Sequence, residues 1–214
     1  ICKLDIVYND QTSCTVVSDG SWLVGKDKLR FAELYDGEIY DSNYQSVPVE
    51  AQVLEHDKSI IVKQQGVYVT EQEKIAPLSI INAPNGDVLI DFGQNLTGYF
   101  EFTVKAKKGD KVAFTVCEEL DKYGNFYNEN YRDAKARFEY ICKDGKNTYK
   151  PTLAFWGFRY MRVDSFPCEI TKENIKAIVV HSNIKRTGYI ESSNAKLNQL
   201  FSNIIWGQKG NFLD

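Results

Sequence analysis

The sequence has few of the residues from which metal and redox sites are built. Its two histidines, His56 and His181, lie far apart, and its cysteines include no Cys-x-x-Cys pair. A zinc knuckle and a thioredoxin-like motif both need such spacing, so neither is predicted. The odd number of scattered cysteines favours reduced thiols, most of them packed as small hydrophobic side chains, and hence a cytoplasmic location. The five are Cys2, Cys14, Cys117, Cys142 and Cys168.

Long apolar runs and an excess of positive charge are also missing. No apolar run approaches the roughly 18 residues of a membrane-spanning helix. With 26 Lys and Arg against 29 Asp and Glu, the net charge is −3, which leaves no basic stripe for nucleic acid. Neither a G-x-S-x-G elbow nor a phosphate-binding P-loop occurs. We therefore expect no nucleic-acid or membrane partner and no cofactor.

Aromatic residues are abundant, and they indicate strands. The chain contains 13 Tyr and 12 Phe but a single Met, and aromatic side chains are frequent in β-sheets. In "YFEFTVKAKKGDKVAFTV", residues 99–116, apolar and polar residues alternate on both sides of a turn at "KKGD". This pattern predicts a β-hairpin. Further strands are predicted in residues 136–151, 157–166, 175–184 and 186–192, with one long polar connection at residues 117–135.

Near its end the sequence changes from a two-residue to a helical period. Apolar residues recur at the spacing of one helix face, with Ser193 or Asn194 as the N-cap and Gly207 or Gly210 as the terminator. The stripe consists of Leu197, Leu200, Phe201, Ile204 and Ile205. The predicted fold is therefore all-β, an antiparallel, jelly-roll-like β-sandwich with a partial N-terminal β-unit and one C-terminal helix.

Several acidic and aromatic residues are candidates for chemistry. Glu118 and Glu119 are adjacent, so on a strand they would point to opposite faces and could not cooperate. A denser acidic set lies around Gly37 but lacks the closing Glu of a calcium loop, which favours turn chemistry over a metal site. The set consists of Asp36, Glu38 and Asp41. Three tryptophans could stack on sugars, although in strands Trp more often packs in a core or domain interface. They are Trp22, Trp156 and Trp206.

The stretch "DFGQNLTGYF", residues 91–100, combines an acid, two amides and two glycines within an apolar run. It could be a catalytic loop, a sugar-binding loop or a structural turn. We predict a turn, in which Asp91 and Gly93 shape the start of a strand and the amides of Gln94 and Asn95 satisfy backbone groups. Gly98 would allow a bend or a close approach of another backbone. The alternative is a contact with a neighbouring catalytic domain.

Three blocks carry a resemblance to a known family. Residues 91–145, "YKPTLAFWGFRYMRV" and "VVHSNIKRTGYIESSNAKLNQLFSNIIWGQKGNFLD" resemble the β-sandwich region of bacterial α-L-rhamnosidases. Upstream, "SDGSWLVGKDKLRFAELYDGEIYDS" is similar to the end of the family's N-terminal β-domain. The resemblance implies an inverting glycoside hydrolase whose acid and base lie in an (α/α)₆ barrel beyond the counterpart of "GNFLD". It assigns no catalytic, carbohydrate-binding or metal-binding residue to this chain.

The resemblance and the pattern together predict how the chain is organised. The sequence opens without Met in a strand-like pattern and stops just after a helical one, so we expect a piece of a longer polypeptide. Residues 1–74 would be the end of an N-terminal β-domain with connecting strands, residues 75–190 the β-sandwich, and residues 191–214 the first barrel helix. The segment itself would be inactive, with the catalytic barrel as its partner and rhamnoside substrate reached through the whole protein. An autonomous carbohydrate-binding module and a purely structural adaptor remain the alternatives.

Overall fold

The computed structural model describes residues 2–213, and the chain divides into two compact units. The first unit comprises the segment up to Lys28 and the segment Tyr44–Gln64. The second comprises Leu29–Asn43 and the chain from Gln65 onward. Each unit is therefore built from two separate stretches of sequence.

The first unit consists of two small antiparallel ribbons. Strands β1 (Lys3–Val7) and β2 (Ser13–Val17) form one ribbon, and β3 (Leu23–Val24) and β6 (Val49–Glu50) form the other. None of the described residues of this unit is buried. The unit consequently has no apolar core of its own.

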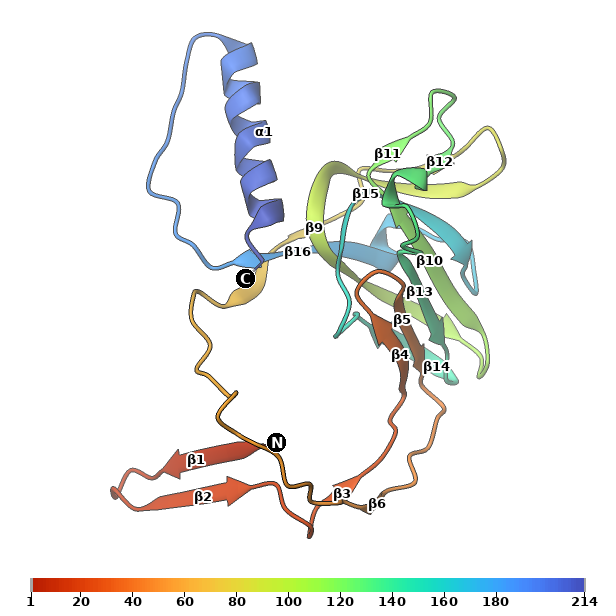
Figure 1. The fold of residues 1–214 in the computed structure, drawn as a ribbon. Helices are drawn as coiled ribbons and strands as arrows, with labels where there is room; N and C mark the ends of the chain where they lie inside the picture. The colour runs from red at the N-terminus through yellow and green to blue at the C-terminus, as the bar shows by residue number, and fades with distance from the viewer. Residues whose placement is uncertain (1, 214) are drawn as a thin grey trace. The chain divides into compact units, whose positions relative to one another are not determined.

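The second unit is built on one curled sheet of ten strands (Figure 1). Along the sheet the strands run in the order β4-β5-β13-β10-β15-β9-β16-β7, while β8 and β14 also pair with β9. All pairs are antiparallel except β5 with β13. The strands are β4 (Leu29–Glu33), β5 (Gly37–Asp41), β7 (Val69–Ile75), β8 (Ser79–Asn82), β9 (Val88–Ala106), β10 (Lys111–Cys117), β13 (Arg137–Ile141), β14 (Gly145–Tyr149), β15 (Trp156–Ser165) and β16 (Ile175–Ser182).

The connections of this unit contain the remaining elements. The polar segment between β10 and β13 holds a small ribbon of β11 (Glu119–Leu120) and β12 (Phe126–Tyr127), followed by the 3₁₀ turn η1 (Glu129–Tyr131). A second 3₁₀ turn, η2 (Lys172–Asn174), precedes β16. The prediction of an all-β fold with one helix is confirmed.

An aromatic core fills the inside of the curled sheet. Phe100 lies at its centre, with ring centroids 5.3 Å from Phe114, 5.1 Å from Phe138 and 5.9 Å from Trp156. The edge-to-face contacts with the two phenylalanines have the geometry that aromatic pairs prefer. Burial alternates along this part of β9, with Phe102 and Val104 also inside. The two-residue period of the sequence is thus the inside-outside period of the sheet.

The predicted hairpin at residues 99–116 is wrong. The turn is present, since Gly109 has φ of 91° and Asp110 N–H donates to the Lys107 carbonyl at 3.1 Å. The strands on either side of it, however, do not pair. Strand β15 lies between β9 and β10 in the sheet, and the two strands meet instead through core side chains such as Phe100 and Phe114. Alternation alone does not distinguish hydrogen-bonded strands from strands that face each other across a core.

The C-terminal helix α1 (Ala195–Asn211) is present with the predicted cap. The side chain of Asn194 accepts a hydrogen bond from Lys196 N–H at 3.0 Å. The predicted terminators are wrong, because Gly207 and Gly210 lie inside the helix and neither has a positive φ. The predicted strand at residues 186–192 is also absent. Within residues 2–213, no helix has the length and apolar character needed to cross a membrane.

Candidate functional site

The stretch 91–100 is a bulge inside strand β9 rather than a turn between two strands. Asp91 pairs with Tyr160 of β15, and Leu96 pairs with Phe158. Residues 92–95 of β9 therefore face the single residue Arg159. Gly93 adopts a φ of 75° in this bulge, a conformation that glycine tolerates at no steric cost.

The side chain of Asp91 stabilises the bulge through hydrogen bonds. Its carboxylate accepts hydrogen bonds from the Gly93 N–H at 2.7 Å and from Arg159 Nε and Nη2 at 2.9 and 3.0 Å. Burial by itself raises the pKa of Asp91, but the hydrogen bonds from Arg159 and Gly93 outweigh it and hold the pKa below the ordinary value. The same contact raises the pKa of Arg159. The pair is therefore ionised and ties β9 to β15.

Beyond the bulge, Gly98 permits a close backbone approach between β9 and β16. A Cβ atom at this position would lie 1.9 Å from the carbonyl oxygen of Ile178 on β16. The predicted role of Gly98 in backbone approach is confirmed. The predicted role of Asn95 is wrong, because its amide donates to the Glu118 side chain at 3.1 Å and not to a backbone group.

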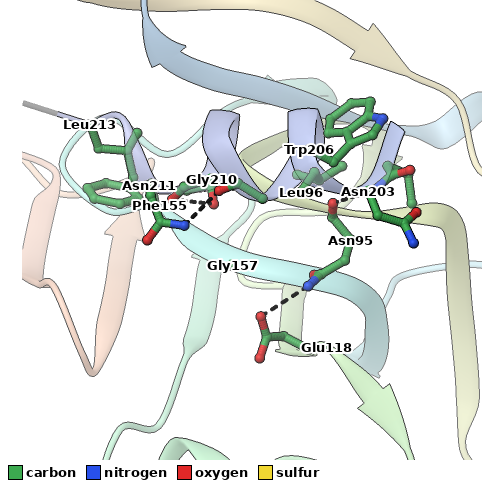
Figure 2. Close-up of a pocket in the computed structure, with 13 residues that line it drawn as sticks. Asn95, Leu96, Glu118, Phe155, Gly157, Asn203, Trp206, Gly210, Asn211 and Leu213 are labelled. Atoms are coloured by element: carbon green, nitrogen blue, oxygen red, sulfur yellow. Dashed lines mark hydrogen bonds between the residues drawn. The ribbon is translucent and has the colours of Figure 1, made fainter. Parts of the chain in front are cut away.

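The bulge, the start of β15 and the second half of α1 border a cavity of about 600 Å³ that is open to solvent, which we name the α1 cavity (Figure 2). Gly210 lets the helix approach β9, since a Cβ there would lie 3.1 Å from Thr97 Oγ1. The Thr97 hydroxyl donates to the Gly210 carbonyl at 3.3 Å. The cavity is lined by Gln94, Asn95, Leu96, Thr97, Glu118, Phe155, Gly157, Asn203, Trp206, Gly207, Gly210, Asn211 and Leu213.

Contacts outside the cavity hold α1 in place on the sheet. Lys209 Nζ pairs with Glu73 of β7 at 2.7 Å and lies 4.0 Å from the centre of the Trp206 ring. The Ser182 N–H at the end of β16 donates to the carbonyl of Phe212 at 2.6 Å. The second half of the helix is therefore attached to three strands, whereas Leu197, near its start, is 53% exposed.

A smaller cavity of about 360 Å³ adjoins the first and shares Glu118, Phe155 and Gly157 with it. The Tyr131 hydroxyl donates to the Gly157 carbonyl at 2.5 Å at this point. Burial, followed by the negative charge of Glu118, raises the pKa of Tyr131, so its hydroxyl stays protonated and keeps donating. Glu118 is half-buried and is the one charged side chain that the described part of the chain contributes to the lining of the α1 cavity.

The structure separates the other acidic candidates. Glu118 lies in the bend between β10 and β11 and lines the cavity, whereas Glu119 of β11 is exposed and does not line it. Around Gly37, Asp36 pairs with Lys135 at 2.7 Å, while Asp41 accepts a hydrogen bond from Asn43 N–H at 2.9 Å. In the part of the chain that the structure describes, no three His, Cys, Asp or Glu residues are grouped to hold a metal ion.

Glu38, the third member of that set, has a structural role. It is 1% exposed and accepts hydrogen bonds from the Tyr149 hydroxyl at 2.6 Å and from the N–H groups of Thr152 and Leu153, both at 3.0 Å. These bonds satisfy its buried charge and attach β5 to the segment between β14 and β15. Nothing in the sequence pattern indicates that this acid is buried.

The tryptophans, histidines and cysteines divide among core, surface and cavity. Trp156 is a core residue stacked on Phe100, Trp22 is exposed, and Trp206 lines the α1 cavity. His56 is exposed, and His181 contacts the Ser182 carbonyl. The prediction that most cysteines are packed is wrong, because three are exposed. The exposed cysteines are Cys2, Cys14 and Cys168, and the buried ones are Cys117 and Cys142.

Comparison with known proteins identifies the family of both parts of the chain. The sequence model described as the bacterial alpha-L-rhamnosidase concanavalin-like domain matches residues 81–181. The model of the alpha-L-rhamnosidase N-terminal domain matches residues 1–78. An alpha-L-rhamnosidase of Alteromonas sp. (strain LOR) is 36% identical over 100% of this chain and 25% of its own length.

Solved structures agree with these matches. The native alpha-L-rhamnosidase of Aspergillus terreus superposes with a TM-score of 0.87 at 29% identity, over 98% of this chain and 26% of that chain. The alpha-L-rhamnosidase of Streptomyces avermitilis, solved in complex with L-rhamnose, also gives a TM-score of 0.87 at 29% identity, over 99% and 22% of the two chains. This chain thus spans about a quarter of the length of the relatives it matches. The chain belongs to the bacterial α-L-rhamnosidase family, in which it corresponds to the N-terminal and concanavalin-like domains.

Proposed function

We propose that this chain is a non-catalytic β-sandwich segment of an α-L-rhamnosidase. The whole protein would hydrolyse terminal α-L-rhamnosides with inversion, and its acid and base would lie in a helical barrel outside these residues. The observation that carries the proposal is that both family models match here, while the relatives are about four times as long. Residues 75–190 would form the sandwich, and residues 191–214 would begin the barrel.

The cavity described above supports this assignment. Inverting hydrolysis of a glycoside takes two carboxyl groups roughly 6.5–9.5 Å apart, one as acid and one as base. Among residues 2–213, Glu118 alone supplies a carboxylate to the α1 cavity. A single acid can bind a hydroxyl or orient a neighbour, but it cannot both protonate the leaving oxygen and activate water.

The exposed face of α1 fits a partner that is the rest of the same polypeptide. Leu197, Leu200 and Ile204 are each more than half exposed, and they occupy successive turns of one helix face. Exposed apolar stripes of this kind commonly mark surfaces that another element covers. In this proposal the covering element is the following part of the barrel.

An assay of the 214-residue chain on an aryl α-L-rhamnoside tests the proposal. We expect no turnover above buffer, with the intact Alteromonas enzyme as the positive control. Turnover at a rate near that of the intact enzyme would show that the catalytic groups are within this chain and would refute the proposal.

A further inference from the structure

We propose that the α1 cavity is a subsite for one uncharged saccharide unit, held between Glu118 and Asn95 on the sheet and the amides of α1. The class of ligand rests on the proposed function, whereas the place and mode of binding rest on the cavity. No residue of this chain is otherwise assigned to sugar binding.

The sheet side of the cavity offers hydrogen-bond acceptors. Asn95 Nδ2 donates to Glu118 Oε1 at 3.1 Å, and this contact orients both side chains (Figure 2). Glu118 Oε2 and Asn95 Oδ1 then have no donor among the described residues. A carboxylate oxygen beside an amide oxygen suits two neighbouring hydroxyl groups, and hydrogen bonds to a charged acceptor are about twice as strong as neutral ones.

The helix side offers both donors and acceptors. Asn203 accepts from the Gln199 amide at 2.7 Å, which leaves its own NH₂ group without a partner in the described part of the chain. Asn211 donates to the Gly207 carbonyl at 2.6 Å, which leaves its side-chain oxygen available. Each sugar hydroxyl both donates and accepts hydrogen bonds. A cavity with acceptors on the sheet side and both donors and acceptors on the helix side can therefore bind several hydroxyl groups of one sugar.

Size, charge and apolar surface point to the same ligand. A volume of about 600 Å³ falls within the usual range of small-molecule sites. Glu118 is the sole charged side chain among the described residues of the lining, so an anionic sugar would be repelled and a neutral one would not. Leu96, Phe155 and Trp206 supply apolar surface for the C–H face of a sugar ring. Gly207 leaves the space open, since a Cβ there would meet nothing within 4 Å.

Titration of the ¹⁵N-labelled 214-residue chain with L-rhamnose, followed by NMR, tests the subsite. We expect a dissociation constant on the order of 1–10 mM, which is typical of a ligand of about eleven heavy atoms. Shifts should be confined to the bulge, Glu118 and the second half of α1, including the Trp206 indole. D-glucuronate, of similar size but anionic, should bind at least about fivefold more weakly.

Two variants and one matched control separate binding from folding. Glu118→Gln keeps the shape but removes the charge, and it should weaken rhamnose binding about tenfold and reduce the preference over glucuronate. Glu119→Gln, one residue away and outside the cavity, should change neither the rhamnose affinity nor the preference for rhamnose over glucuronate. Gly207→Leu should fill the cavity from a position with free space and abolish binding while the remaining spectrum keeps its dispersion.

The outcomes distinguish this inference from the proposed function. Absence of rhamnose shifts, equal binding of glucuronate, or equal effects of the Glu118 and Glu119 substitutions would each overturn the subsite and leave the family role intact. Retained binding in Gly207→Leu would overturn it as well. Rhamnoside turnover by the chain would instead refute the proposed function, whatever the titration shows.

Discussion

Substitution of Asp91 by Asn should lower the free energy of unfolding by about 2 kcal/mol. The Asp91 side chain is 8% exposed and accepts three hydrogen bonds, two from Arg159 and one from the Gly93 N–H. Hydrogen bonds to a charged group contribute about 1.5–3 kcal/mol each when fully buried. The Arg159 side chain is 37% exposed, so solvent screens its share, and Asn retains one acceptor oxygen.

Urea unfolding at pH 7, followed by tryptophan fluorescence, measures this loss. The matched control is Asp133→Asn, because Asp133 is exposed and makes no hydrogen bond among the described residues. The control should stay within about 0.5 kcal/mol of the unsubstituted chain. A double-mutant cycle with Arg159→Gln should give a coupling of about 1–2 kcal/mol.

The dependence on pH gives an independent check of the same pair. The native pKa of Asp91 lies below its ordinary value of about 3.9, so its ionised form stabilises the fold above that pH and loses this effect as the pH falls through the native pKa. The stability difference between the chain and Asp91→Asn should therefore be constant from about pH 5 to 7 and shrink below about pH 4. A difference under about 0.5 kcal/mol at pH 7, or one that grows on acidification, would refute the reasoning.

Three further substitutions or measurements follow from the structure. Gly98→Ala should destabilise the fold by about 2–3 kcal/mol in urea unfolding, because the alanine Cβ would lie 1.9 Å from the Ile178 carbonyl oxygen. An unchanged urea midpoint would contradict the close pairing of β9 with β16. Gly207→Ala should raise the thermal midpoint through a gain of about 0.5–1 kcal/mol, since the position is helical with free space, and a lower midpoint would count against this. Thiol labelling at pH 8 should modify three cysteines quickly and leave Cys117 and Cys142 protected until the chain unfolds. Both are buried, and burial raises the pKa of each to about 11. Rapid labelling of all five cysteines would show that the core is open. The three reactive cysteines are Cys2, Cys14 and Cys168.

The candidate cavity was only partly predictable from the sequence. The unusual composition of residues 91–100 indicates the segment that borders the cavity, and the sequence predicts that Gly98 allows a close backbone approach. Glu118 and Glu119 do separate, but through the bend at Glu118 between β10 and β11, which strand alternation does not predict. Nothing in the sequence indicated that Asn95 would meet Glu118, 23 residues away, or that Gly210 would bring α1 against Thr97.

The failed predictions of the hairpin and of the helix terminators both concern contacts between segments that are distant in the sequence. Alternation along β9 and β10 records which face of each strand is buried, but it does not record which strand lies beside it. Strand β15, about 50 residues further along the chain, lies between them because its own apolar face completes the same core. Likewise, the sequence predicts Gly207 and Gly210 as helix terminators, although both lie inside α1, where Gly210 leaves room for Thr97 of β9 and Gly207 has free space around it.

The sequence by itself determined the class of the fold, the strand faces, the single C-terminal helix with its Asn194 cap, and the family. These features depend on local periodicity, capping chemistry and motif order, all of which are properties of residues that are close together in the sequence. Only the tertiary structure decided the order of strands in the sheet, the burial of Glu38, the Asp91–Arg159 pair and the α1 cavity. Each of these joins residues far apart in the chain, and their contacts depend on how the curled sheet closes around its aromatic core.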